Sequence, residues 1–350
     1  MLGAPVTGWR EPPAPRSVLT VTGIASASAA ASAHLRDVSR SHAVTRACLP
    51  DGRAFIIKVL PRDTHLSGRS LVAELYAYRL ASWRPDVAAL LPTCVHLDER
   101  RQVLVLRAAP EEQLFAAQVV DESFPGRALA AALGRALALL HNATADIPAV
   151  TGANCGVLGL PDAPPETRRL GDNSTAGQAA IDMICADDDI AARLRATAQL
   201  LKPACLIHGD VKWDNVIMDA GPPARVTLFD WELSGWGDPA WDVGSALADA
   251  WCLTAHDGMF SGDPTSWLRG SERALLDAYR AGRGDLDAGF ADRVAGCWCA
   301  RTAHLAMECA AGVDDARHPK VGHLLSAAAA LAQHCEEVAD AVAIALGGTR

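Results

Sequence analysis

The side chains best suited to chemistry stand in one short segment, residues 208–215, which reads HGDVKWDN. It follows the apolar run 204–207 and precedes the apolar residues 216–218, a pattern that predicts a loop between two strands. From Asp210 to Asn215 the loop carries a carboxylate, an ammonium group and an amide. Such groups can accept a proton, neutralise negative charge and ligate a hard cation.

A second acid completes the set. Asp230 ends an apolar run fifteen residues after Asn215, and GDPAWD follows shortly after it. Phosphoryl transfer needs this combination, because its catalysis is mostly positioning and neutralisation of concentrated negative charge. Asp210 is the candidate base, and Asn215 and Asp230 are candidate ligands of Mg²⁺, which prefers oxygen donors. Lys212, two residues after the base, can reach a γ-phosphate.

The two segments together resemble the aminoglycoside phosphotransferase and choline kinase superfamily. There, HGDxxxxN precedes a (I/F)DWE…GDPxxD stretch, and this chain carries HGDVKWDN and FDWELSGWGDPAWD. The resemblance is strongest over 204–245 and extends over roughly 34–310. It implies a protein-kinase-like fold that uses ATP and Mg²⁺. It also implies the roles given above to the base and the two metal ligands, and a structural role for Asp238 and Asp242.

A lysine far upstream fits the same scheme. Lys58 lies in the predicted strand 53–60, and Glu74 follows sixteen residues later in a segment with a helical apolar face, 68–82. In kinases a strand lysine holds the α- and β-phosphates and pairs with a helix glutamate. The chain has only four lysines, and two of them, Lys58 and Lys212, stand where a kinase needs an ammonium group.

The phosphate-binding loop departs from the kinase pattern, since no GxGxxG precedes Lys58. The equivalent stretch, 37–42, offers the hydroxyls of Ser39 and Ser41 to phosphate instead. The hinge after the last strand of the first lobe is expected at Arg107 to Ala109, where backbone groups would meet adenine.

The elements that must position these residues divide into two kinds. A strand pair (42–49 and 53–60), a helix and two more strands (91–97 and 102–106) fill the first hundred residues. Beyond them the apolar spacing predicts helices at 127–141, 178–201, 242–256, 265–282, 287–311 and 321–346, with a long loop at 148–177. We therefore expect an α+β, bilobal protein-kinase-like fold. Its parts would be a flexible tail (1–16), a nucleotide-binding N-lobe (17–106) and a catalytic and acceptor-binding C-lobe (107–350).

Composition and charge indicate which partners and which cellular compartment to expect. The net charge of −9 argues against a nucleic-acid partner, which usually requires a basic face. No run of 18 apolar residues occurs, so a membrane span is not expected. The ten cysteines are scattered and lack zinc-site spacing, which is typical of a reducing compartment. We expect a cytoplasmic protein.

The acceptor stays open among three hypotheses. The first is a small molecule with a hydroxyl, aminoglycoside-like or another metabolite. The second is a Ser or Thr of a ribosomal precursor peptide in natural-product biosynthesis, where a partner lyase would then eliminate the phosphate. The third is a pseudokinase that only binds, against which the joint presence of Lys58, Asp210, Asn215 and Asp230 argues.

Overall fold

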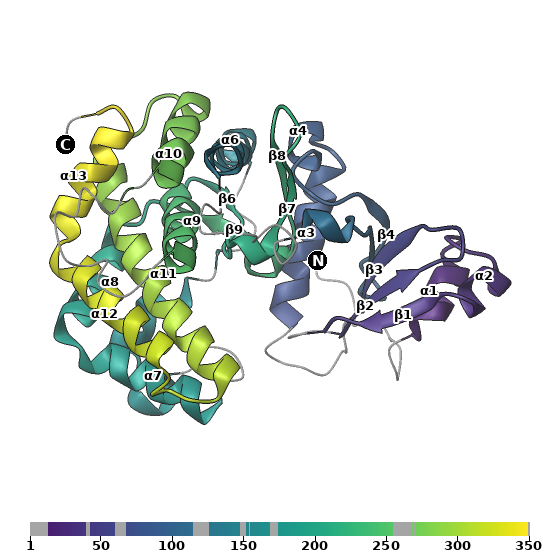
Figure 1. The fold of residues 1–350 in the computed structure, drawn as a ribbon, viewed down its shortest axis with the longest axis horizontal. Coiled ribbons are helices and arrows are strands. Elements are labelled where there is room, and N and C mark those ends of the chain that lie inside the picture. The colour runs from purple at the N-terminus through teal and green to yellow at the C-terminus, as the bar shows by residue number, and fades with distance from the viewer. Residues whose placement is uncertain are drawn as a thin grey trace, which may run out of the picture.

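The computed structural model describes residues 13–39, 43–59, 68–114, 126–147, 152–153, 155–168, 174–254, 268 and 270–348. These residues form two lobes, a sheet-containing N-lobe and a larger, mostly helical C-lobe (Figure 1). The predicted α+β, bilobal architecture is therefore confirmed. None of the described helices combines the length and the apolar character that crossing a bilayer would take.

The N-lobe is built on a five-stranded antiparallel sheet with the order β1-β2-β3-β5-β4. Its strands are β1 (His34–Asp37), β2 (Ala43–Cys48), β3 (Ala54–Val59), β4 (Cys94–Asp98) and β5 (Val103–Arg107). The predicted hairpin is β2–β3, in which Val44 lies opposite Lys58. β5 ends at Arg107, where the hinge was expected.

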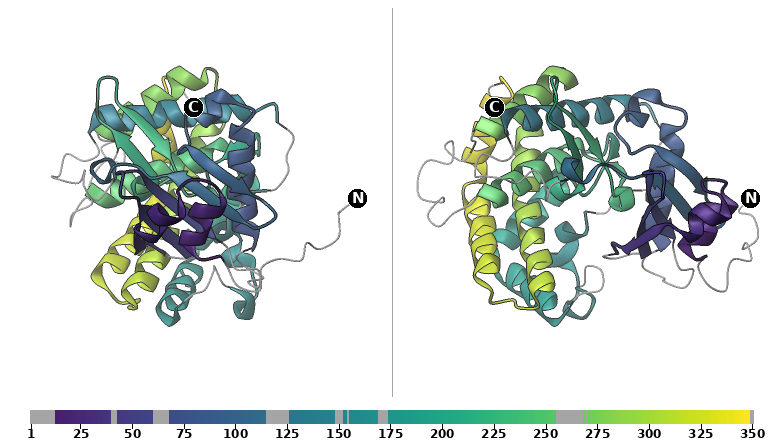
Figure 2. Two further views of the ribbon diagram at one scale, coloured as in Figure 1. Left: turned by 90° about the vertical axis from the view of Figure 1, so that its right-hand side faces the viewer. Right: turned by 45° about the vertical axis from the view of Figure 1, so that its right-hand side comes forward.

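Side-chain alternation in β3 and β5 divides the N-lobe into two packed faces. Phe55 and Ile57 face a cluster with helices α1 (Pro15–Val21) and α2 (Ala27–Ala31), whereas Leu104 and Leu106 pack toward helix α3 (Gly68–Ala81). The two short helices lie at the outer end of the lobe (Figure 2). Since α1 begins at Pro15, the last two residues of the predicted tail are helical.

The C-lobe packs its helices around α11 (Phe290–Val313), which contacts α7, α8, α9, α12 and α13. Their bounds are α7 (Thr175–Ala186), α8 (Asp188–Leu200), α9 (Pro239–Thr254), α12 (Pro319–Gln333) and α13 (Cys335–Ala345). A second packed pair joins α6 (Arg127–Thr144) to α10 (Gly270–Arg283). The short α4 (Pro85–Ala88) connects the N-lobe to α6.

Two of the predicted helices are each two helices in the structure. The stretch 178–201 breaks at Asp187, whose extended backbone ends α7 and whose carboxylate caps α8 by accepting from Ile190 N–H at 2.9 Å. The stretch 321–346 breaks at His334 between α12 and α13. The predicted loop 148–177 also contains the 3₁₀ segments η2 (Gly156–Asp162) and η3 (Pro165–Thr167).

Two small strand pairs lie between the lobes and flank the motif residues (Figure 1). β6 (Cys205–Ile207) pairs with β9 (Gly235–Gly237), and β7 (Val216–Asp219) pairs with β8 (Arg225–Leu228). The HGDVKWDN segment thus leaves β6 and enters β7 through the 3₁₀ turn η4 (Trp213–Asn215), as the flanking apolar runs predicted.

Candidate active site

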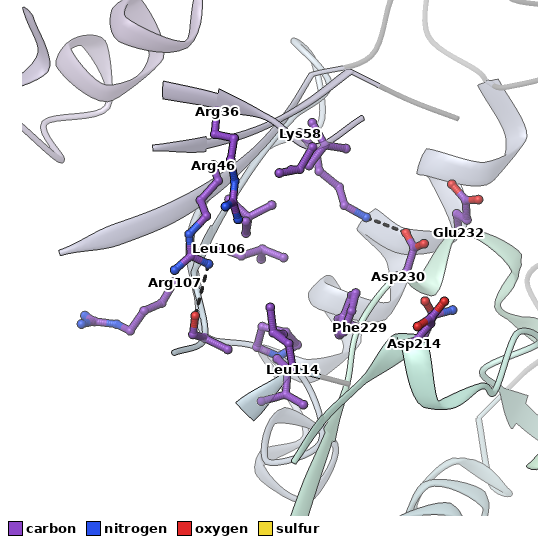
Figure 3. A pocket seen from close by; sticks show the side chains of 17 residues that line it. Arg36, Arg46, Lys58, Leu106, Arg107, Leu114, Asp214, Phe229, Asp230 and Glu232 are labelled. Atoms are coloured by element: carbon purple, nitrogen blue, oxygen red, sulfur yellow. Dashed lines mark hydrogen bonds and ion pairs between the residues drawn. The ribbon is translucent and has the colours of Figure 1, made fainter. Parts of the chain in front are cut away.

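A cavity of about 330 Å³ opens between the lobes and is lined from both of them (Figure 3). The N-lobe sheet contributes an apolar roof with Val44, Ile56 and Leu106, and the C-lobe contributes Ile217 and Phe229 from below. Charged side chains line the cavity at both ends: Lys58, Asp214, Asp230 and Glu232 at what we call the inner end, and Arg36, Arg46 and Arg107 at the other (Figure 3). Asn215 also lines it. An apolar cavity with an ammonium group and oxygen donors at one end suits a planar base that carries phosphates.

Lys58 joins the two lobes at the inner end of this cavity. Its Nζ lies 2.9 Å from each carboxylate oxygen of Glu74 on α3. The same Nζ lies 2.8 Å from Asp230 Oδ1, a contact that Figure 3 shows. Burial opposes the charge on Lys58, but the two carboxylates outweigh it and raise the pKa of the lysine. Glu74 is fully buried, and this burial raises its own pKa against the effect of Lys58. The sequence-predicted pair is therefore in direct contact.

Asp210 is held by three donors. Arg301 Nη2 lies 2.7 Å from Oδ1, while Lys212 Nζ at 2.8 Å and Asn215 Nδ2 at 2.9 Å both reach Oδ2. Burial alone would raise the pKa of Asp210, but Arg301 and Lys212 lower it well below its usual range. The carboxylate is thus ionised and oriented.

The loop that carries Asp210 is fixed from below by Asp242. Its two carboxylate oxygens accept the backbone N–H groups of His208 at 2.7 Å and Gly209 at 2.9 Å. His141 Nε2 lies 3.2 Å from the same carboxylate. Gly209 has φ +83°, and a Cβ there would collide with the carbonyl oxygen of Leu233, so both the turn and the space demand glycine.

The two motif segments are tied to each other as well. His208 Nε2 lies 3.0 Å from the carbonyl oxygen of Phe229, and the His208 ring packs against Trp231 at 4.7 Å between centroids. Asp230, between them, has left-handed backbone angles, φ 66° and ψ 60°. A non-glycine residue rarely adopts this conformation, and such strain concentrates at functional sites. The strained turn aims the Asp230 carboxylate into the cavity (Figure 3).

Asp238 stabilises the chain after the second segment. Its Oδ2 accepts from Arg293 Nε and from the backbone N–H of Lys202, each at 2.6 Å, and its Oδ1 accepts from Ala240 N–H at 2.9 Å. Asp238 is 1% exposed. Its contacts are all internal, in keeping with the structural role that the resemblance implied for it.

The oxygen donors at the inner end of the cavity fit a hard divalent cation. Asn215 donates through Nδ2 to both the carbonyl oxygen and the carboxylate of Asp210, which turns its own amide oxygen away from that residue. Asn215 and Asp230 both line the cavity. Among the described residues no cluster of three or more acidic, His or Cys side chains could enclose a metal. Mg²⁺ needs few ligands from the protein, because it keeps several of its waters and also binds substrate phosphates.

The residues predicted to contact the nucleotide do not all line the cavity. Arg107 and Ala109 line the cavity, and the Ala109 carbonyl oxygen accepts from Arg46 Nη1 at 3.2 Å. The Ser39 hydroxyl accepts from Val44 N–H at 2.9 Å, which links the residues after β1 to the start of β2, and Val38 lines the cavity. Ser41 lies outside the described residues.

Sequence reasoning missed Arg301. The residue sits in the apolar stretch CWCARTAHLAM of α11, and its side chain is 0% exposed. A lone arginine among small and apolar residues of a helix predicts a buried ionic partner. That signal was present, but the partner lies 91 positions away, and no local pattern identifies it.

The fold and the site together define a protein-kinase-like phosphotransferase. A sequence model of the phosphotransferase enzyme family matches residues 44–293, and the chain belongs to this family. No curated protein matches the sequence closely enough to count as a relative.

Solved structures share the fold at low sequence identity. A choline/ethanolamine kinase family protein from Mesorhizobium loti is 17% identical with a TM-score of 0.58, over 93% of this chain and 97% of that one. An amicoumacin kinase in complex with AMP-PNP, Ca²⁺ and Ami is 15% identical with a TM-score of 0.57, over 86% and 87%. The choline kinase LicA from Streptococcus pneumoniae is 11% identical with a TM-score of 0.54, over 86% and 93%.

Proposed function

We propose that the protein transfers the γ-phosphoryl group of ATP to a hydroxyl of a small-molecule acceptor, with Mg²⁺ bound at Asn215 and Asp230. The observation that carries the proposal is the direct contact of Lys58 and of Asp210 with the two candidate metal ligands, Asp230 and Asn215. Lys58 contacts Asp230 directly, and Asp210 contacts Asn215, which lines the same cavity. One cavity thus offers a cation for phosphates, two oxygen ligands and a nearby base.

The nucleotide occupies the apolar cavity. Adenine stacks between the roof residues Val44 and Ile56 and the floor residues Ile217 and Phe229, and its edge meets the backbone at Ala109. The phosphates extend toward Lys58, whose ammonium group Glu74 holds in place. The amicoumacin kinase with AMP-PNP and Ca²⁺ supports a nucleotide and a divalent cation in this fold.

In the transfer step, the acceptor hydroxyl oxygen forms a bond to the γ-phosphorus as the bond from that phosphorus to the bridging oxygen breaks. ADP leaves with the electron pair, and Asp210 takes the hydroxyl proton. Because its pKa is low, Asp210 receives the proton as the oxygen bonds to phosphorus and becomes acidic, and before that it orients the hydroxyl. Mg²⁺ supplies neutralisation of the charge on the phosphate oxygens. Lys212 stands next to the base and balances charge on the same side.

The test is mass spectrometry of an acceptor panel incubated with enzyme, ATP and Mg²⁺, with Asp210→Ala as the matched control. Related structures are named as kinases of choline, ethanolamine and amicoumacin, so the panel begins with amino alcohols and aminoglycosides and adds Ser- and Thr-containing peptides. A phosphate on a small molecule, absent with Asp210→Ala, supports the proposal. Phosphate on peptides alone would support the precursor-peptide hypothesis, and no ATP turnover with any acceptor would overturn the proposal in favour of a pseudokinase.

A further inference from the structure

Arg301 reaches the candidate base from the centre of the C-lobe. It lies midway along α11, its side chain is 0% exposed, and its Nη2 is 2.7 Å from Asp210 Oδ1. Through this contact the core helix of the lobe meets the loop leaving β6. A buried arginine costs desolvation energy unless it is fully paired, so its position calls for a role that a smaller apolar residue could not fill.

The other side of the Arg301 guanidinium is also held. Nη1 donates to His304 Nδ1 at 2.8 Å and lies 3.5 Å from Glu308 Oε1, one and two turns further along the same helix. His304 accepts from a cation through Nδ1, which requires the neutral ring. Burial, and secondarily the charge of Arg301, lower the pKa of His304 to about 4, in agreement with a neutral ring. The guanidinium is therefore fixed between the base and its own helix.

Lys212 makes a contrasting contact with the same carboxylate. It reaches Oδ2, the oxygen that also accepts from Asn215, and its side chain is 18% exposed on a loop. An ammonium group on a flexible stem is a point charge that can change partners, whereas a planar guanidinium with several fixed partners cannot. The two oxygens of Asp210 thus have different kinds of cationic partner.

We propose that Arg301 is a positioning residue for the transfer reaction: it pins Asp210 through Oδ1 and leaves Oδ2 for the acceptor hydroxyl once Lys212 turns toward the phosphates. This inference rests on the proposed function. The anchor sets the direction of the carboxylate relative to the cavity without touching nucleotide or acceptor. A displacement of about 1 Å at a reacting group costs roughly a hundredfold in rate, so loss of the anchor should lower turnover and spare nucleotide affinity.

The experiment measures basal ATP·Mg²⁺ hydrolysis, in which water replaces the acceptor hydroxyl, together with nucleotide affinity and melting temperature. Arg301→Met should lower kcat roughly a hundredfold and leave the ATP Kd within about twofold. Arg301→Lys, which keeps the positive charge but not the planar set of donors of a guanidinium, should recover part of kcat. In an Asp210→Asn background, Arg301→Met should have no further effect on kcat, because the group that it orients is gone.

The matched control is Arg293→Met. Arg293 is also a buried arginine of α11, but its carboxylate partners are Asp238 and Asp287 rather than the base. We expect it to lower the melting temperature and to keep kcat. Equal losses of kcat in both variants, or additive losses with Asp210→Asn, would show a merely structural role and overturn the inference.

Three further outcomes can be told apart. If Arg301→Met does not fold, Arg301→Lys and Arg293→Lys distinguish a positioning role of Arg301 from a merely structural one. A lower kcat in Arg301→Lys alone supports the positioning role, and equal kcat values in the two variants refute it. If the wild-type protein neither binds nor hydrolyses ATP, the proposed function fails and the inference falls with it. If the wild type hydrolyses ATP and Arg301→Met does so at the same rate, only the inference fails.

Discussion

Lys58 on β3 and Glu74 on α3 form a buried ion pair in which one ammonium group contacts both carboxylate oxygens at 2.9 Å. Glu74 is 0% exposed, so its charge depends on Lys58. Lys58→Met should therefore lower the free energy of unfolding by about 3–5 kcal/mol, because it leaves a buried carboxylate without a partner. It should also weaken ATP binding. Urea unfolding and nucleotide titration measure the two effects.

The matched change is Glu74→Gln, which leaves Lys58 paired with Asp230. We expect a smaller loss of stability than with Lys58→Met and a retained, weaker nucleotide affinity. If Lys58→Met kept the stability and the ATP affinity of the wild type, the lysine would have neither of the roles given to it here.

The turn at Gly209 gives a second prediction. Gly52 and Gly209 both have φ near +85°, but a Cβ at Gly52 would meet nothing within 4 Å, whereas one at Gly209 would strike Leu233. Gly52→Ala should therefore cost only the backbone strain, about 1–2 kcal/mol. Gly209→Ala should cost about 1–3 kcal/mol more, from overpacking, and should lower turnover by moving Asp210. Thermal unfolding of the two variants gives the comparison, and equal melting temperatures would contradict it.

The elements that the sequence predicted are those with strong local patterns. The β2–β3 hairpin has alternating apolar residues around Pro50-Asp51-Gly52, and α6 and α11 have long apolar faces. Helices α1 and α2 were not predicted, because their small residues show no apolar period and their packing against Phe55 and Ile57 leaves no local sign in the sequence. The strand β9, Gly235–Gly237, was not predicted for a similar reason, since glycine is depleted in strands and pairing with β6 and with Gly152 defines it.

In the candidate site, too, the residues with a local sequence pattern could be predicted and the contacts between distant segments could not. The loop residues and Lys58 could be proposed from the sequence, because phosphoryl transfer demands their residue types at fixed spacing. Contacts made through the fold were not, and Arg301 is the main example, since its distance along the chain from Asp210 leaves no local sign of the pair. The hydrogen bond from Val44 N–H to the Ser39 hydroxyl is another contact that the sequence did not predict, and the phosphate contact of Ser39 stays a prediction.

Asp249 on α9 supports the catalytic loop and predicts a pH effect. Its carboxylate accepts Trp213 N–H at 2.6 Å, and burial raises its pKa to about 6 from 3.8. A carboxyl group with a raised pKa stabilises the fold at low pH, and this contribution is lost as the pH rises through about 6. The loss in the free energy of unfolding amounts to about 3 kcal/mol. Asp249→Asn removes the ionisation, so its stability relative to the wild type should rise by about that amount between pH 4 and pH 7.

The measurement is urea unfolding of both proteins at several pH values. Asp287→Asn serves as the control, because the pKa of Asp287 is lowered, by hydrogen bonding to Arg293 above all, and its contribution to stability has the opposite sign. A stability difference between Asp249→Asn and the wild type that did not change across pH 4–7 would show that Asp249 titrates as an ordinary carboxylate.

Asp230 carries the last prediction, which concerns the metal. Its carboxylate lies in the cavity with one oxygen on Lys58, and with Asn215 it forms the sparse oxygen set that suits Mg²⁺. Asp230→Asn should therefore bind ATP in Mg²⁺ no better than the wild type binds it in EDTA. Asp214→Asn, which changes another carboxylate lining the same cavity, should keep the difference between Mg²⁺ and EDTA. Titration of a fluorescent ATP analogue in Mg²⁺ and in EDTA measures the effect for both variants. Loss of the Mg²⁺ effect in Asp214→Asn alone would show that Asp214, and not Asp230, is the metal ligand.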